Sequence, residues 1–85
     1  MSTRAEIIAA FTSVARDHDK ALAPLTDDLP LLDSGIDSLC MAVIVTTLEV
    51  ELGVDPFSAA AEVDVPATFG EFVALYEHAL QHAVH

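Results

Sequence analysis

The stretch Gly35-Ile36-Asp37-Ser38-Leu39 separates a long turn-rich segment from an apolar segment that ends at Gly53. Asp-Ser directly before an apolar run is typical of a helix start, because these residue types cap the free N–H groups of a first turn. We therefore expect Ser38 in the first turn of a helix, with its hydroxyl exposed. The helix dipole would favour an anionic group esterified to that oxygen. The alternative interpretation is an ordinary helix cap with no further function.

The apolar segment after Ser38 is predicted to be a helix over residues 38–52. Its β-branched run Val43–Thr47 would suit a strand, but the segment does not alternate, and Gly53 is a good helix stop. The inner face is expected to comprise Met41, Ile44, Val45, Leu48 and Leu52. The outward face would then comprise Leu39, Ala42, Val43, Thr46, Glu49 and Val50. An outward face this apolar suggests a docking surface. The alternative, given equal weight, is that the loop or a neighbouring helix covers this face.

Upstream, Thr3-Arg4-Ala5-Glu6 has the form of a capping box, with Thr3 as the N-cap. Apolar residues then recur at three- and four-residue steps, which predicts an amphipathic helix at about residues 4–18. Its buried face would comprise Ile7, Ile8, Phe11, Val14 and Ala15.

Residues 19–36 are predicted to form a long ordered loop whose leucines hold it against the helices. The loop contains Leu22, Leu25, Leu29, Leu31 and Leu32 among its prolines and aspartates. Loops of this length are uncommon in small domains and are often functional. The aspartates lack the spacing of a calcium-binding EF-hand and are interpreted as solvated turn residues.

The C-terminal part is predicted to contain two further helices. Asp55-Pro56 is a typical N-cap followed by a first-turn proline, which predicts a short helix over Phe57 to Glu62. Thr68-Phe69-Gly70-Glu71 has the form of a second capping box, and an amphipathic pattern follows it to about residue 82. The expected fold is a single all-α domain over residues 1–85: a small bundle of three main helices and one short helix, with a long loop between the first two.

Composition narrows the class of protein further. The chain has 85 residues, 53% of them hydrophobic, which is enough for one small core. The longest apolar run is far shorter than a membrane span, and the N-terminus does not have the form of a signal peptide. The single cysteine, Cys40, excludes an internal disulfide. The expected location is therefore cytoplasmic, with no membrane association.

The charge is strongly negative, with fourteen acidic residues, three basic residues and a formal net charge of −11. So few cations exclude binding to a nucleic-acid backbone as the main activity, and the charge disfavours an anionic membrane surface. It would attract basic partners, or it would only keep the protein soluble.

No hydrolytic or metal-binding constellation stands out, so the chain is not expected to be an enzyme. Ser38 lacks the Gly-x-Ser-x-Gly motif of a nucleophilic serine. Cys40 is interpreted as a partly buried apolar residue on the flank of its helix rather than as a reactive thiol. His78, His82 and His85 would allow a metal site on the last helix, but late helix positions favour histidine in any case.

Residues 31–39, Leu-Leu-Asp-Ser-Gly-Ile-Asp-Ser-Leu, resemble the phosphopantetheine attachment motif of acyl carrier proteins, Gly-x-Asp-Ser-Leu. The resemblance extends over essentially the whole chain, including the first amphipathic helix, the leucine-bearing loop, the helix that closes at Leu52-Gly53 and the Pro66-x-Thr68 entry to the last helix. The resemblance implies that Ser38 carries 4′-phosphopantetheine derived from coenzyme A. The neighbouring motif residues Asp37 and Leu39 would form part of the same cofactor-binding site. The arm would hold an acyl or aminoacyl group as a thioester.

The resemblance also implies partners and roles. A phosphopantetheinyl transferase would modify Ser38, with Asp37 helping to position the transferase and its metal. Loading ligases, synthases and transferases would dock on Leu39, Ala42, Val43, Thr46 and Glu49. Inner residues would line the space that receives a bound chain: Ile44, Val45, Leu48 and Phe72. Such carriers are usually monomers.

The segment after Ser38 departs from the strongly acidic helix of carriers in bacterial fatty acid synthesis. Residues 40–43 are uncharged, and the acidic residues of the segment are Glu49 and Glu51. This difference favours a free-standing acyl carrier of a specialised pathway, such as polyketide, nonribosomal peptide or modified fatty acyl synthesis. The alternatives are a peptidyl or aminoacyl carrier, which more often has Gly in place of Asp37, and a small helical interaction module without a prosthetic group.

Overall fold

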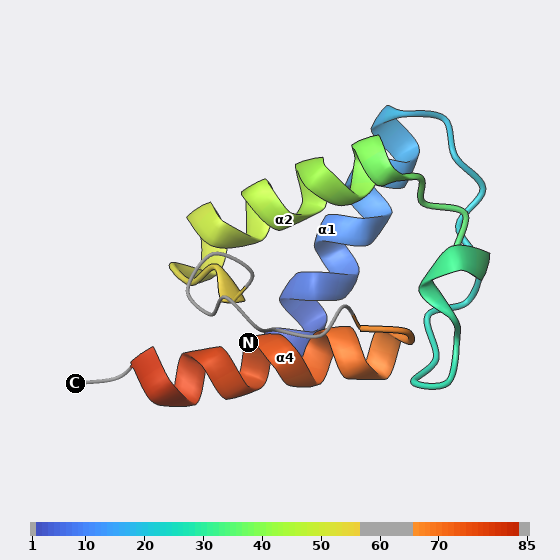
Figure 1. Cartoon of the computed structure of the whole chain (residues 1–85). Coiled ribbons are helices and arrows are strands. Elements are labelled where there is room, and N and C mark those ends of the chain that lie inside the picture. Colours follow the sequence, from blue (N-terminus) through green and yellow to red (C-terminus); the bar gives the residue numbers. More distant parts are fainter. Residues whose placement is uncertain (1, 57–65, 84–85) are drawn as a thin grey trace.

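The computed structural model describes residues 2–56 and 66–83, and within these ranges the chain is helical, with no strand (Figure 1). Helix α1 spans Thr3–Asp17, α2 spans Ser38–Leu52 and α4 spans Phe69–Ala83. A short 3₁₀ helix, η1, spans Leu31–Asp33 in the long connection between α1 and α2. The predicted all-α class is confirmed for this part of the chain. The predicted short helix over Phe57 to Glu62 lies outside the described residues.

Helix α1 begins one residue earlier than predicted. Ser2 has an extended backbone, and its hydroxyl accepts a hydrogen bond from the N–H of Ala5 at 3.1 Å. Ser2 is therefore the N-cap, and the prediction of Thr3 was wrong by one residue, because Thr3 already belongs to the helix. The helix ends at Asp17, and His18 follows as its C-cap.

Helices α2 and α4 both begin with the capping expected from the sequence. The side chain of Asp37 caps α2, and Gly53, with a φ of 75°, closes it in the left-handed conformation. At the start of α4 the N–H of Glu71 donates to Thr68 Oγ1 at 3.2 Å, and Glu71 Oε1 accepts from the N–H of Ala67 at 2.9 Å. The second capping box thus forms, although Glu71 reaches back to Ala67 rather than to Thr68.

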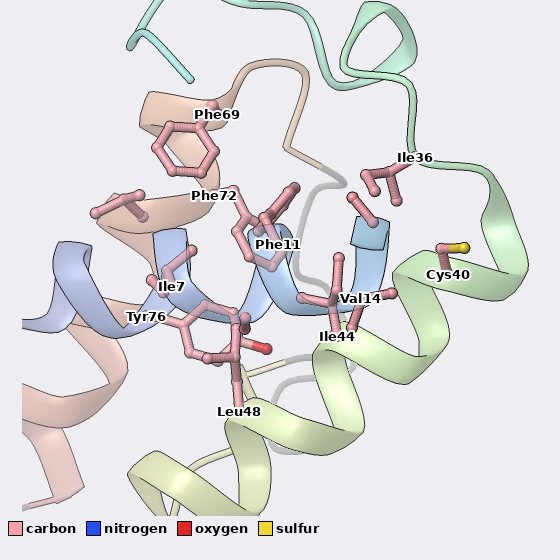
Figure 2. Packing of buried hydrophobic residues seen from close by; sticks show 13 residues of the cluster. Ile7, Phe11, Val14, Ile36, Cys40, Ile44, Leu48, Phe69, Phe72 and Tyr76 are labelled. Carbon is pink, nitrogen blue, oxygen red and sulfur yellow. The ribbon is translucent and has the colours of Figure 1, made fainter. Parts of the chain in front are cut away.

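The core lies where α1 passes between α2 and α4, and its centre is aromatic (Figure 2). The ring of Phe11 on α1 meets the rings of Phe69 and Phe72 on α4 edge to face, with centroid distances of 5.3 and 5.4 Å. Phe72 also contacts Tyr76, at 5.0 Å between centroids. Burial of such large side chains is the main source of stability in a domain of this size. The predicted buried face of α1 is confirmed at Phe11, and the amphipathic pattern predicted for the last helix is confirmed by the burial of Phe69, Phe72 and Tyr76.

The buried face of α2 is rotated from the predicted one. Ile44 and Leu48 are buried as expected, but the third buried residue is Cys40, whereas Met41, Val45 and Leu52 are only partly buried. The stripe of Cys40, Ile44 and Leu48 repeats every four residues, which is the spacing of one helix face. Packing against α1 thus selects a face centred on this stripe.

The long loop is fastened to the entry of α4 by backbone hydrogen bonds. Leu31 N–H donates to Ala67 O at 2.9 Å, Phe69 N–H donates to Leu29 O at 2.9 Å, and Gly70 N–H donates to Asp27 O at 3.0 Å. A Cβ added to Gly70 would lie 2.8 Å from Asp27 O, so only glycine permits this approach. The loop is thereby ordered, as predicted, and its end is held beside the start of α2 (Figure 1).

Four of the five loop leucines pack against the core, and one does not. Leu32 is 97% exposed, whereas the other four are partly buried: Leu22, Leu25, Leu29 and Leu31. The prediction that Leu32 holds the loop to the helices was therefore wrong. Leu31 and Leu32 are neighbours in η1, and successive side chains of a 3₁₀ helix point about 120° apart, so only one of the two can face the core.

In the described part of the chain, none of the helices combines the length and the apolar character needed to cross a membrane.

Candidate functional site around Ser38

The chain reversal before Ser38 is built from Ser34 and Gly35. The fully buried Ser34 hydroxyl donates to Leu31 O at 2.6 Å and accepts from the N–H of Ile36 at 3.3 Å. Gly35 has a φ of 94°, and a Cβ at this position would lie 2.1 Å from Ala21 O. Only glycine fits here, because both the conformation and the space exclude a side chain. These contacts fix the path by which the chain reaches the start of α2.

Asp37 is the N-cap of α2. Its backbone is extended, its Oδ1 accepts from the N–H of Cys40 at 2.8 Å, and its carbonyl accepts from the N–H of Met41 at 2.9 Å. The bond from Met41 is the first regular bond of the helix, and the Asp37 side chain satisfies one of the leading N–H groups, that of Cys40. The N–H groups of Ser38 and Leu39 have no acceptor among the described residues. The start of α2 thus retains donors and a positive dipole end.

The other carboxylate oxygen of Asp37 is paired with Lys20. The distance from Lys20 Nζ to Asp37 Oδ2 is 3.0 Å. The hydrogen bond from the Cys40 N–H and the bond from Lys20 hold the pKa of Asp37 well below its usual range. The same pair raises the pKa of Lys20. Both groups are charged at neutral pH, so the residue that directly precedes Ser38 takes part in an ion pair.

Ser38 is the first residue of α2 and is exposed, as predicted. Its hydroxyl makes no side-chain hydrogen bond with any described residue. Asp37, and not Ser38, performs the capping. The Ser38 oxygen is therefore available to solvent or to a partner, and its role as a cap is excluded in this structure.

Two apolar hollows adjoin Ser38. One, of about 480 Å³, lies along α2 and towards α4, and its described lining includes Val45, Pro66 and Phe72. The other, of about 610 Å³, lies between η1 and the start of α2, and its described lining includes Leu32, Ile36 and Ala67. Leu31, Ser38, Met41 and Pro66 line both. A group attached to the Ser38 oxygen would thus have apolar surface within reach on two sides.

The residues expected to receive a bound chain separate into two groups. Val45 and Phe72 line the first hollow. Ile44 and Leu48 do not line either hollow, because both are completely buried in the core against α1. Whether a bound chain reaches Ile44 and Leu48 stays a prediction.

The predicted docking residues lie largely outside the core. Leu39 is 66% exposed, and three further predicted residues are exposed: Ala42, Thr46 and Glu49. Val43 is the exception, since it is partly buried and packs against the core. Val50 is 81% exposed and Leu32 adds a second exposed leucine near Ser38. The described structure therefore has exposed apolar side chains on α2, as expected, and one more on the loop, at Leu32.

Cys40 is more deeply placed than predicted. Its side chain is completely buried and belongs to the core cluster (Figure 2). Burial is the main cause that raises the pKa of its thiol, and the Asp37 carboxylate adds to it. A buried protonated thiol behaves as a small apolar residue.

The histidines of the last helix do not form a described metal site. Among the side chains that the structure describes, no three His, Cys, Asp or Glu residues converge on one point. His78 is exposed, whereas His82 and His85 lie outside the residues whose side chains are described.

Three features of this region could not be read from the sequence: the Lys20–Asp37 pair, the buried Ser34 and the exposure of Leu32. Lys20 and Asp37 lie seventeen positions apart, so no local pattern joins them.

No known family model matches the chain, and no curated protein or solved structure matches it either.

Proposed function

We propose that this protein is an acyl carrier, which holds acyl groups as thioesters on a 4′-phosphopantetheine arm attached to Ser38. The observation that carries the proposal is an exposed serine hydroxyl at a helix start whose capping is already performed by its neighbour. A serine in this position has no structural duty that explains it. It also lies within the Gly-x-Asp-Ser-Leu motif, in a small acidic all-α domain.

The modification would be a transfer of a phosphoryl-linked group. The Ser38 oxygen forms a bond to the phosphorus that bears the pantetheine arm, and the bond from that phosphorus to adenosine 3′,5′-bisphosphate breaks. The hydroxyl proton passes to a base of the transferase. The product is a phosphodiester, which the free N–H groups at the start of α2 would stabilise. The arm supplies the thiol on which an acyl group is carried.

The surroundings of Ser38 fit such a group. The hollows beside it are lined mainly by apolar side chains, so an acyl group on the arm would be able to lie against the protein. The exposed residues Leu39, Ala42, Thr46 and Glu49 would contact partner enzymes, with Leu32 as an addition from the loop. Weak docking of an acidic surface on basic enzymes would allow one carrier to visit several of them. Under this proposal the partner enzymes determine whether the carried group is acyl or aminoacyl, and in which pathway it is used.

The test is the intact mass of the protein after incubation with coenzyme A and a broad-specificity phosphopantetheinyl transferase. The wild type should gain one phosphopantetheinyl group, and Ser38→Ala should gain none. Because Asp37 remains as the cap, we expect Ser38→Ala to change the free energy of unfolding by less than about 0.5 kcal/mol, as at other exposed surface positions. The variant is therefore a folded control, and absence of modification in the wild type would refute the proposal.

A second candidate is a helical interaction module without a prosthetic group. The exposed Leu32, Leu39 and Val50 favour it, because exposed apolar patches mark contact surfaces. Under this alternative Ser38→Ala would leave partner binding unchanged, and no mass gain would occur.

A further inference from the structure

Lys20 has a position that the carrier function does not by itself explain. Two ion pairs are described, Arg4–Asp27 and Lys20–Asp37, and only the second involves a residue next to Ser38. The backbone of Lys20 is held as well, because its N–H donates to Ala15 O at 2.7 Å just beyond the end of α1. The ammonium group is therefore brought to Asp37 from a fixed part of the chain.

Asp37 creates an electrostatic conflict at the site. Its carboxylate folds back over the first turn of α2 to reach the N–H of Cys40, so it lies at the helix end where a group on Ser38 would also lie. An anionic group on the Ser38 oxygen would meet this carboxylate in a protein whose formal net charge is −11. Like charges on adjacent residues at one helix end repel each other. Lys20 supplies the opposite charge at 3.0 Å from Asp37 Oδ2.

We propose that Lys20 is a positioning residue that acts through Asp37 and offsets its charge, so that an anionic group is accepted on Ser38. The inference rests on the proposed function, in which that group is the phosphodiester of the pantetheine arm. The low pKa of Asp37 agrees with this role, because the carboxylate stays ionised at neutral pH and its charge is present beside Ser38.

The first experiment needs no transferase. Ser38→Glu and Ser38→Gln differ by one negative charge at the site, and the ratio of their unfolding constants in urea measures the cost of that charge. Each of the two Ser38 variants is made alone and in combination with Lys20→Met, Lys20→Arg or Arg4→Met, and the ratio is compared among these four backgrounds. Arg4→Met is the matched control, because it removes the other described ion pair and the same net charge.

Without Lys20, the charge at position 38 should cost more. We expect the Glu-to-Gln ratio of unfolding constants to rise roughly two- to fivefold in Lys20→Met at low salt, the range typical of one exposed ion pair. Lys20→Arg should restore the wild-type ratio, Arg4→Met should keep it, and 0.5 M salt should diminish the rise. An unchanged ratio in Lys20→Met, or the same rise in Arg4→Met, would overturn the proposal.

The second experiment uses the modified protein. Attachment of the arm to Ser38 should change the melting temperature less favourably in Lys20→Met than in the wild type or in Arg4→Met, whatever the sign of the change in the wild type. An equal apo-to-holo shift in all three proteins would overturn the role of Lys20 while leaving the carrier function intact. Failure of the wild type to gain mass would instead refute the carrier function, and with it the assignment of the phosphodiester as the anionic group.

Discussion

Gly35 is the residue that determines where the chain turns towards Ser38. Its φ of 94° and the 2.1 Å approach of Ala21 O to a hypothetical Cβ exclude any side chain. Gly53 also has a positive φ, of 75°, but no atom lies within 4 Å of a Cβ built there. A side chain at Gly53 would meet only an unfavourable backbone conformation, whereas a side chain at Gly35 would meet the same kind of conformation and a steric clash.

Gly35→Ala should destabilise the protein considerably more than Gly53→Ala. The left-handed conformation alone costs a non-glycine residue about 1–2 kcal/mol, which is the expected loss at Gly53. At Gly35 the clash with the Ala21 carbonyl adds to this loss, so the backbone must shift. Urea unfolding of the two variants measures the difference, and equal losses would contradict the described contact between Gly35 and Ala21.

At the scale of the element, the start of α2 depends on one ionised carboxylate. Asp37 caps the helix and pairs with Lys20, and both interactions require its charge or are strengthened by it. Its pKa is lower in the folded protein than in the unfolded chain. Asp37 therefore stabilises the fold above the unfolded pKa of about 4, and this contribution is lost as the pH falls towards the folded pKa.

Asp37→Asn should flatten the dependence of stability on pH. The wild type should lose stability on acidification from roughly pH 5 to pH 2, and the variant should lose less over the same interval, because asparagine still caps the helix but does not titrate. Urea midpoints measured across this interval provide the test, with Asp33→Asn as the control for removal of one negative charge. Parallel curves for wild type and Asp37→Asn would show that the pair does not contribute.

The same helix illustrates what the sequence could and could not predict. Its start and end followed from local signals, since Asp37 and Gly53 act within their own turns. Its buried face did not, because α2 is apolar on nearly every side and carries no clear periodicity. Only packing against α1 chooses the Cys40, Ile44 and Leu48 stripe. The candidate serine was predictable from its motif, whereas the Lys20 pair required the folded loop.

At the scale of the whole molecule, stability depends on a thin core. Phe11 is the side chain that joins α1 to two rings of α4. A domain of this size buries little surface, and its total stability amounts to only about 5–15 kcal/mol. One large cavity at this point would remove a substantial part of that total.

Phe11→Ala should cost about 3–5 kcal/mol, the usual loss for a buried aromatic residue, and should bring the protein close to unfolding. Leu32→Ala is the matched control, because Leu32 is 97% exposed and its removal should change stability by less than about 0.5 kcal/mol. Thermal unfolding followed by circular dichroism compares the two. A large loss for Leu32→Ala would contradict the described orientation of η1.

The most direct test of the carrier function is to locate the modification in the chain. After reaction with coenzyme A and a phosphopantetheinyl transferase, tandem mass spectrometry can distinguish Ser38 from Ser34, four residues earlier. We predict one phosphopantetheinyl group, attached to the exposed Ser38, while the buried Ser34 stays unmodified. No modification, or modification elsewhere in the folded protein, would contradict the account.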